Sequence, residues 1–228
     1  MTTGGGPSVD GTSATGTIVL VHGGLYDGGS AEEWWDASGV IDALASRRLP
    51  VMVHRRPAQP TRWADESAAL AATLADAGPM PVVVAAADGC SAALRLAVDQ
   101  PGRIARLVLA WPAVAGDPVR DELLRVCAIE QGQAAVVDDL ADGGTVRGVA
   151  DAELAALSVP VVLWPTFPEN QFHPTSTITR LAEAVPQPIV IGGSPLPTLP
   201  AFESFVDRFV SLVAEAAVFD EEDLAELS

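Results

Sequence analysis

The sequence predicts an α/β fold: a mainly parallel, doubly wound sheet of about six strands with a short helical cap. Six short apolar runs recur along the chain, and they are continuous rather than alternating, as is typical of strands buried on both faces. Most of these runs are followed by a stretch with helical spacing, which predicts right-handed crossovers between parallel strands. Hydrophobic residues make up 49% of the 228 positions, enough for one domain with a sizeable core.

The expected elements alternate along the chain. The apolar runs predict strands at residues 17–21, 50–54, 81–86, 106–111, 159–164 and 188–191. The amphipathic stretches predict helices at residues 39–48, 63–77, 91–100, 175–184 and 201–217.

The interval 113–158 is longer than a single crossover helix needs. It contains three further helical stretches, at residues 121–128, 130–140 and 151–156. An insertion after the carboxyl end of a strand in a doubly wound sheet lies over the ligand crevice. We therefore expect this interval to form a small cap.

The two ends differ in composition from the rest. Residues 1–16 lack both the positive region and the apolar region of a signal peptide, and we expect a flexible leader before a domain at 17–218. The segment 219–228 is acidic and is expected to fray. No apolar run reaches the length of about eighteen residues that a membrane span requires, so we expect no membrane association.

The formal net charge of −17 argues against nucleic acid as a partner, because such a chain repels phosphate backbones. The simplest reading is a solvated acidic surface. Cys90 and Cys127 are too few for a disulfide framework or a zinc site, which favours a cytoplasmic location. We expect a small-molecule ligand and neither metal nor cofactor, and the oligomeric state stays open.

The segment IVLVHGG, residues 18–24, resembles the first strand and oxyanion loop of the α/β-hydrolase fold superfamily. The resemblance implies that the backbone N–H groups of Gly24 and Leu25 face a substrate carbonyl oxygen. Glycine suits this position because the backbone must approach a ligand closely. His22 belongs to the same loop and is expected to be structural more often than catalytic.

The segment PVVVAAADGCSAALRLA, residues 81–97, resembles the strand, nucleophile elbow and helix of that superfamily. The pattern there is G-x-S-x-G, a strained turn that presents the nucleophile. Aligning the helix and the following Pro101 puts Ala87 at the nucleophile position, with Gly89 as the glycine two residues on. A shifted frame, GCSAA at residues 89–93, would put Ser91 there, and both frames stay open.

The other two members of the triad also depart from the pattern. Where the superfamily carries an aspartate after the fifth strand, this chain has Glu169 or Asn170. Where it carries a histidine after the last strand, this chain has Ser194, and no histidine follows His173. Because a triad works as a unit, the resemblance does not imply ordinary esterase or lipase activity.

Several residues are candidates to replace the triad. Asp88 at the start of a helix is either a general base or nucleophile, or a helix cap. His173 is either a relocated base oriented by Glu169, or a loop histidine bonded to the backbone. Trp111 and Trp164 end strands at the ligand edge of the sheet, where they either wall an apolar pocket or pack in the core.

Two classes of function follow, and whether the chain is an enzyme stays open. The first is a catalyst outside the serine mechanism, performing ester or lactone hydrolysis, elimination or cyclisation on a small, largely apolar molecule. The alternative is a catalytically inactive module that binds a small molecule or presents its acidic surface to a basic protein. Fold alone does not choose between them.

Overall fold

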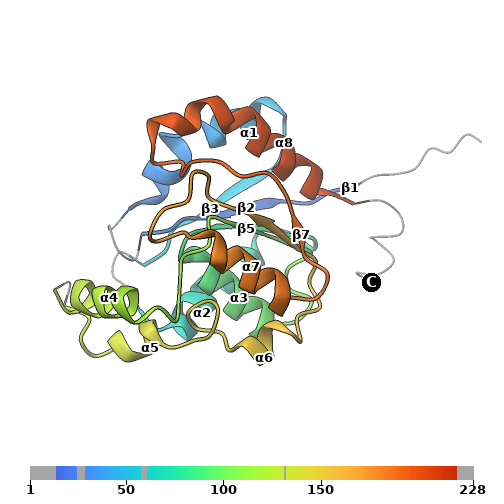
Figure 1. The fold of residues 1–228 in the computed structure, drawn as a ribbon. Helices are drawn as coiled ribbons and strands as arrows, with labels where there is room; N and C mark the ends of the chain where they lie inside the picture. The colour runs from blue at the N-terminus through green and yellow to red at the C-terminus, as the bar shows by residue number, and fades with distance from the viewer. Residues whose placement is uncertain (1–13, 25–28, 58–60, 131, 220–228) are drawn as a thin grey trace, which may run out of the picture.

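The computed structural model describes residues 14–24, 29–57, 61–130 and 132–219, and its centre is a parallel sheet (Figure 1). Six strands lie in the order β3-β2-β4-β5-β6-β7, with every neighbouring pair parallel. The strands are β2 (Ile18–Val21), β3 (Val51–His54), β4 (Val82–Ala86), β5 (Arg106–Ala110), β6 (Val161–Trp164) and β7 (Ile189–Val190). The predicted parallel sheet of about six strands is confirmed.

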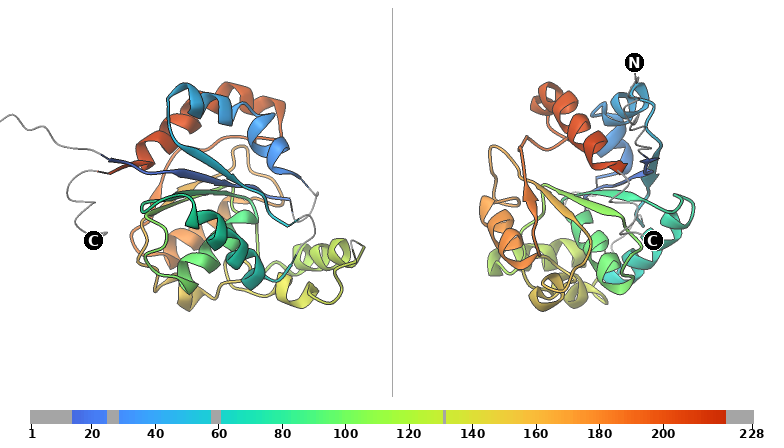
Figure 2. Two further views of the ribbon diagram at one scale, coloured as in Figure 1. Left: turned by 180° about the vertical axis from the view of Figure 1, so that it is seen from behind. Right: turned by 90° about the vertical axis from the view of Figure 1, so that its right-hand side faces the viewer.

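Helices cover both faces of the sheet, as the continuous apolar strands predict (Figures 1 and 2). Alternate strand residues feed two separate cores: Ile18 and Leu20 face one, and Val19 and Val21 face the other. The first core is closed by the short helices η1 (Glu32–Asp36) and η2 (Pro200–Phe205), and by α1 (Val40–Ser46) and α8 (Val206–Ala216). The second is closed by α2 (Trp63–Ala75), α3 (Gly89–Asp99), α6 (Asp151–Leu154) and α7 (Thr175–Ala184).

The interval after β5 holds helices α4 (Pro118–Glu130), α5 (Val137–Ala141) and α6. The predicted helix at 130–140 is wrong in its first half, because α4 runs on to Glu130 and helix resumes only at Val137. Helices α4 and α5 form a lobe that projects from the body of the molecule in Figure 1 and in the left view of Figure 2. The lobe packs on the start of α2 through Trp63.

A two-stranded antiparallel ladder joins the two ends of the described chain. Strand β1 (Ala14–Thr15) pairs with β8 (Val218–Phe219), and the Gly16 N–H donates to the carbonyl of Ala217 at 2.9 Å. Gly16 is confined, since a Cβ there would lie 2.3 Å from the carbonyl oxygen of Met80. None of the described helices is both long enough and apolar enough to span a bilayer.

Candidate functional site

The turn between β4 and α3 is strained at Ala87, whose φ is +49°. A positive φ costs a residue with a side chain roughly 1–2 kcal/mol, so the surrounding structure must hold it. Gly89 follows because a Cβ there would lie 2.6 Å from the carbonyl oxygen of His22. Ser91 instead lies within α3, where it is buried. The sharp turn is therefore centred on Ala87.

The loop after β2 lies beside this turn. A Cβ added to Gly23 would lie 2.6 Å from Cζ2 of Trp34 and 2.8 Å from Cβ of Ala87. The N–H of Gly24 donates to Oδ1 of Asp88 at 3.0 Å. Leu25, the second expected amide donor, lies outside the described residues. Of the two expected amide donors, the described one is that of Gly24. It is already hydrogen-bonded to a carboxylate of the chain itself.

Asp88 belongs to a buried ion-pair network. Its Oδ2 accepts from Nη1 of Arg56 at 2.5 Å, and Nε of Arg56 donates to Oε2 of Glu66 at 3.0 Å. Burial opposes the charge of Arg56, but the facing carboxylates of Asp88 and Glu66 outweigh it and hold the Arg56 pKa above its ordinary value. The expected helix cap is not formed, because the Asp88 side chain makes no capping hydrogen bond.

Two neutral histidines border this network. Nδ1 of His22 lies 2.5 Å from the carbonyl oxygen of Gly23, and its Nε2 accepts the backbone N–H of Arg56 at 3.3 Å. Nδ1 of His54 lies 2.8 Å from Oγ1 of Thr73. Burial, and next the charge of Arg56, lower the pKa of both imidazoles, that of His54 to about 4. His54 therefore carries no charge near neutral pH, and both histidines hold neighbouring segments in place through hydrogen bonds.

Ser194 occupies the turn after the last strand, where the resemblance leads us to expect a histidine. It is fully buried, and its Oγ accepts from Nε1 of Trp111 at 3.2 Å and from Nε1 of Trp164 at 2.9 Å. Its hydroxyl donates to the carbonyl of Pro195 at 3.0 Å. The structure thus brings these three predicted residues together around a hydroxyl that is fully engaged.

An aromatic cluster fills the space above the elbow. Its rings lie 5.0–6.4 Å apart between centroids, and Ala87 packs in the same core. The cluster consists of Trp34, Trp35, Trp111, Trp164, Phe202 and Phe209. Trp111 is itself strained at φ +50°, and its ring lies within the cluster. The methyl group of Ala87 is consequently a core side chain, with 5% exposure for the residue.

Glu169, Asn170 and His173 lie in one loop after β6. Oδ1 of Asn170 accepts the N–H groups of Phe172 and His173 at 2.9 and 3.1 Å, which makes Asn170 a turn-former. Oε2 of Glu169 accepts the N–H of Thr175 at 2.8 Å at the start of α7, and this bond lowers the Glu169 pKa. The Glu169 side chain is exposed and bonds to a helix end, whereas His173 is buried.

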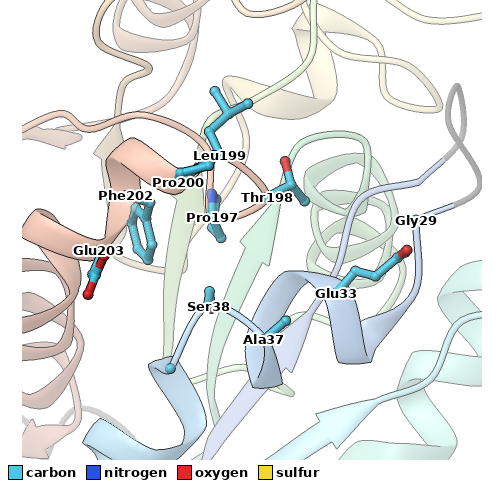
Figure 3. A pocket seen from close by; sticks show the side chains of 11 residues that line it. Gly29, Glu33, Ala37, Ser38, Pro197, Thr198, Leu199, Pro200, Phe202 and Glu203 are labelled. Atoms are coloured by element: carbon cyan, nitrogen blue, oxygen red, sulfur yellow. The ribbon is translucent and has the colours of Figure 1, made fainter.

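A cavity of about 760 Å³ opens between η1 and residues 197–203 (Figure 3). Both walls follow carboxyl ends of strands, β2 and β7, which is where a doubly wound sheet places its ligand crevice. Phe202 lines the cavity and also belongs to the aromatic cluster. Among the described lining residues, Glu33 and Glu203 are the charged ones, and Leu199 is an exposed apolar one.

Comparison with known proteins identifies the fold through solved structures. No protein-family model matches the chain, and a search of curated proteins finds no match. Among solved structures, the meta-cleavage product hydrolase CumD of Pseudomonas fluorescens IP01 is 20% identical at a TM-score of 0.62, over 90% of this chain and 92% of that one. The fold is that of the α/β-hydrolases.

Two other solved structures agree with this fold. NosK of Streptomyces actuosus is 17% identical at a TM-score of 0.61, and the match covers 90% of this chain and 99% of that one. An N-acyl homoserine lactone degrading enzyme is 13% identical at a TM-score of 0.62, covering 89% of this chain and 94% of that one. At identities this low, the matches show the α/β-hydrolase fold and do not assign an activity.

The sequence interpretation missed three residues that shape this site, Arg56, Glu66 and Glu33. Arg56 and Glu66 fix Asp88, and the signal for them was an arginine just after a strand with a glutamate ten residues on. Glu33 sits on η1, whose five residues are too few to show a helical period. Across the described part of the chain, no three His, Cys, Asp or Glu side chains gather as metal ligands would.

Proposed function

We propose that this α/β-hydrolase-fold protein binds a small, largely apolar molecule and does not hydrolyse it by the serine mechanism. The observation that carries the proposal is the state of the elbow, where Ala87 offers a methyl group and packs inside the aromatic cluster. Serine-type hydrolysis needs an activated nucleophile and free donors for the developing oxyanion. Here the Gly24 donor is held by Asp88, and the position after the last strand is Ser194.

The cavity beside η1 supports binding. Its volume lies in the range of small-molecule sites, and apolar walls at Pro197, Leu199 and Phe202 suit a ring or short acyl chain. Any charge on the ligand is expected to be positive, because the described lining carries Glu33 and Glu203 and no Lys or Arg.

A second candidate, catalysis outside the serine mechanism, is favoured by one observation. Asp88, Arg56, Glu66 and His22 form a cluster of buried titratable groups next to the elbow, and such clusters concentrate at active sites. Ester or lactone hydrolysis, elimination and cyclisation each need a proton acceptor, and Asp88 is the carboxylate nearest the elbow. Both of its carboxylate oxygens are already engaged, one by Arg56 and the other by the Gly24 N–H, which ranks this candidate second.

The test is a thermal-shift screen with a parallel measurement of ligand fate. The probes are p-nitrophenyl butyrate, an N-acyl homoserine lactone and an aromatic amine with its neutral and acidic analogues. We expect one probe to raise the Tm of the wild type and to be recovered unchanged by mass spectrometry. Thr198→Trp fills the cavity and should abolish the shift, whereas Thr179→Trp, the same change on the exposed side of α7, should leave it intact.

Consumption of a probe decides between the two candidates. Turnover by wild type that disappears in Asp88→Asn, with a folded variant by circular dichroism, would replace binding by the second candidate. A Tm shift that survives Thr198→Trp but not Thr179→Trp would move the ligand away from this cavity. No shift and no turnover with any probe would remove small-molecule binding of these classes.

A further inference from the structure

Helix α4 exposes an apolar face that the proposed ligand site does not use. Val119, Leu123, Val126 and Ile129 are 67%, 39%, 43% and 54% exposed, respectively. Their spacing of four, three and three residues places them along one side of the helix, and we call them the α4 stripe. Exposed apolar residues are ordinary when scattered, but a continuous row on one helix marks an interaction surface.

The opposite side of the same helix is already satisfied. Leu124 and Ala128 are buried in a small core with Trp63, Ala92 and Leu140. A surface helix ordinarily carries one apolar face, which packs on the body, and a polar face toward water. Helix α4 has a second apolar face, on a lobe that projects from the molecule (Figures 1 and 2). Stability of the fold alone therefore does not account for the stripe.

The two arginines near the stripe are engaged, whereas, among the described residues, two of its carboxylates are not. Arg120 is turned to the carbonyl of Gln171, at 3.1 Å from Nε, and Arg125 pairs with Asp138 on α5. Glu122 and Glu130 lie at helical positions next to the stripe, and within the described residues neither makes an ion pair. The face thus offers apolar contact together with two uncompensated carboxylates.

We propose that the α4 stripe docks an amphipathic helix of a partner protein whose apolar face is bordered by Lys or Arg. The ten-residue interval from Val119 to Ile129 spans about 15 Å, which matches about three turns of a second helix. Lysines or arginines on the partner meet Glu122 and Glu130, and the net charge of −17 steers a basic partner toward this chain.

The same charges disfavour other occupants. A second copy would bring together two chains of charge −17 with like carboxylates beside the stripe. An anionic membrane surface attracts basic segments and repels this one. The inference rests on α4 alone and does not depend on the ligand cavity beside η1.

The experiment uses the full chain and a labelled helical peptide of leucines and lysines, about three turns long, followed by fluorescence anisotropy. A leucine–glutamate peptide of the same length is the charge control. We expect the wild type to bind the lysine peptide, and Leu123→Ser with Val126→Ser to weaken binding by at least about tenfold. Ile189→Ser with Val190→Ser changes two exposed apolar residues on β7 in the same way and should bind like wild type.

A second pair of substitutions tests the charges. Glu122→Gln with Glu130→Gln should weaken binding of the lysine peptide and make that binding less sensitive to salt. Equal binding by the α4 and β7 variants, or no binding by the wild type, would overturn the proposal. Equal binding of the lysine and glutamate peptides would overturn the inference that the partner is basic. Dimers in sedimentation velocity that vanish in the α4 variant would make a second copy the occupant instead.

Discussion

Asp88 ties three segments of the chain to one carboxylate. Oδ1 accepts the Gly24 N–H after β2, Oδ2 accepts from Arg56 after β3, and the residue itself directly precedes α3. Removing one partner of a buried ion pair leaves an uncompensated charge and costs about 3–5 kcal/mol. Asp88 is therefore first a residue that positions the loops around the elbow, and any proton transfer must work against that pairing.

Restoring the missing hydroxyl should not restore hydrolysis. In Ala87→Ser the new hydroxyl has no histidine at Ser194 to accept its proton and faces the aromatic cluster. We expect turnover of p-nitrophenyl butyrate equal to that of wild type, and no acyl-enzyme by intact-mass measurement. A burst of p-nitrophenol from Ala87→Ser alone would show that a base exists that the contacts do not reveal.

His54 should make stability depend on pH. Burial and the charge of Arg56 lower its pKa from 6.5 to about 4, so the unfolded chain binds the proton more readily between these values. The free energy of unfolding should therefore be highest above pH 6.5 and fall toward pH 4, by up to about 3 kcal/mol from this group.

Urea unfolding at several pH values isolates the contribution of His54. His54→Asn keeps a donor for Thr73 and removes the titration, so the gap between wild type and variant should narrow as pH falls through this window. The acidic side chains titrate in both proteins and cancel in the difference. A constant gap between the two curves would contradict the assignment.

Residue types gave the elbow but not its surroundings. Aligning the helix and Pro101 with the superfamily pattern favoured Ala87 over Ser91, and the structure has its sharp turn at Ala87, with Gly89 against the carbonyl oxygen of His22. Arg56 could not be assigned from sequence, because its ion pair joins the loop after β3 to Asp88, which is distant along the chain. The predicted catalytic roles of Asp88, Glu169 and His173 stay predictions.

At the scale of elements, continuous apolar runs located the strands, and helical periodicity located most of the helices, to within a few residues. Buried parallel strands are continuous apolar runs, and those runs are legible in sequence. Short elements carry no period: β1 and β8 have two residues each, and both fell within or beside the expected leader and tail. The stretch 132–136 before α5 showed helical spacing, but the structure has helix only from Val137.

The β1–β8 ladder should contribute to stability through one side chain. Phe219 is 1% exposed, packs in the first core and lies under the guanidinium of Arg106, whereas Val218 beside it is 45% exposed. We expect Phe219→Ala to lower the free energy of unfolding by about 3 kcal/mol or more, and Val218→Ala by under about 0.5 kcal/mol. Similar small losses for both, measured by denaturant titration, would mean that the ladder is not packed in solution.

At the scale of the whole molecule, the net charge of −17 destabilises the compact state through self-repulsion. Raising NaCl from about 0.01 M to about 0.15 M shortens the Debye length from about 30 to about 8 Å. We expect a gain of about 1 kcal/mol, seen as a rise in Tm of about 2–4 °C. The same salt series at pH 4.3, the pI of the sequence, is the control and should show little change. Equal slopes at both pH values would assign the effect to something other than net charge.

Four of the five tryptophans sit in the aromatic cluster, which gives the protein an intrinsic optical probe. Trp34, Trp35 and Trp111 lie 6.2–6.4 Å apart, close enough for their excited states to couple and to produce a strong near-ultraviolet dichroism. The ring of Phe202 packs edge-on against that of Trp111, with 5.7 Å between the ring centroids, and Phe202 also lines the cavity. Occupation of the cavity should thus alter the tryptophan fluorescence and the near-ultraviolet dichroism of the unlabelled protein. Ligand binding could then be detected by spectroscopy before the ligand is identified.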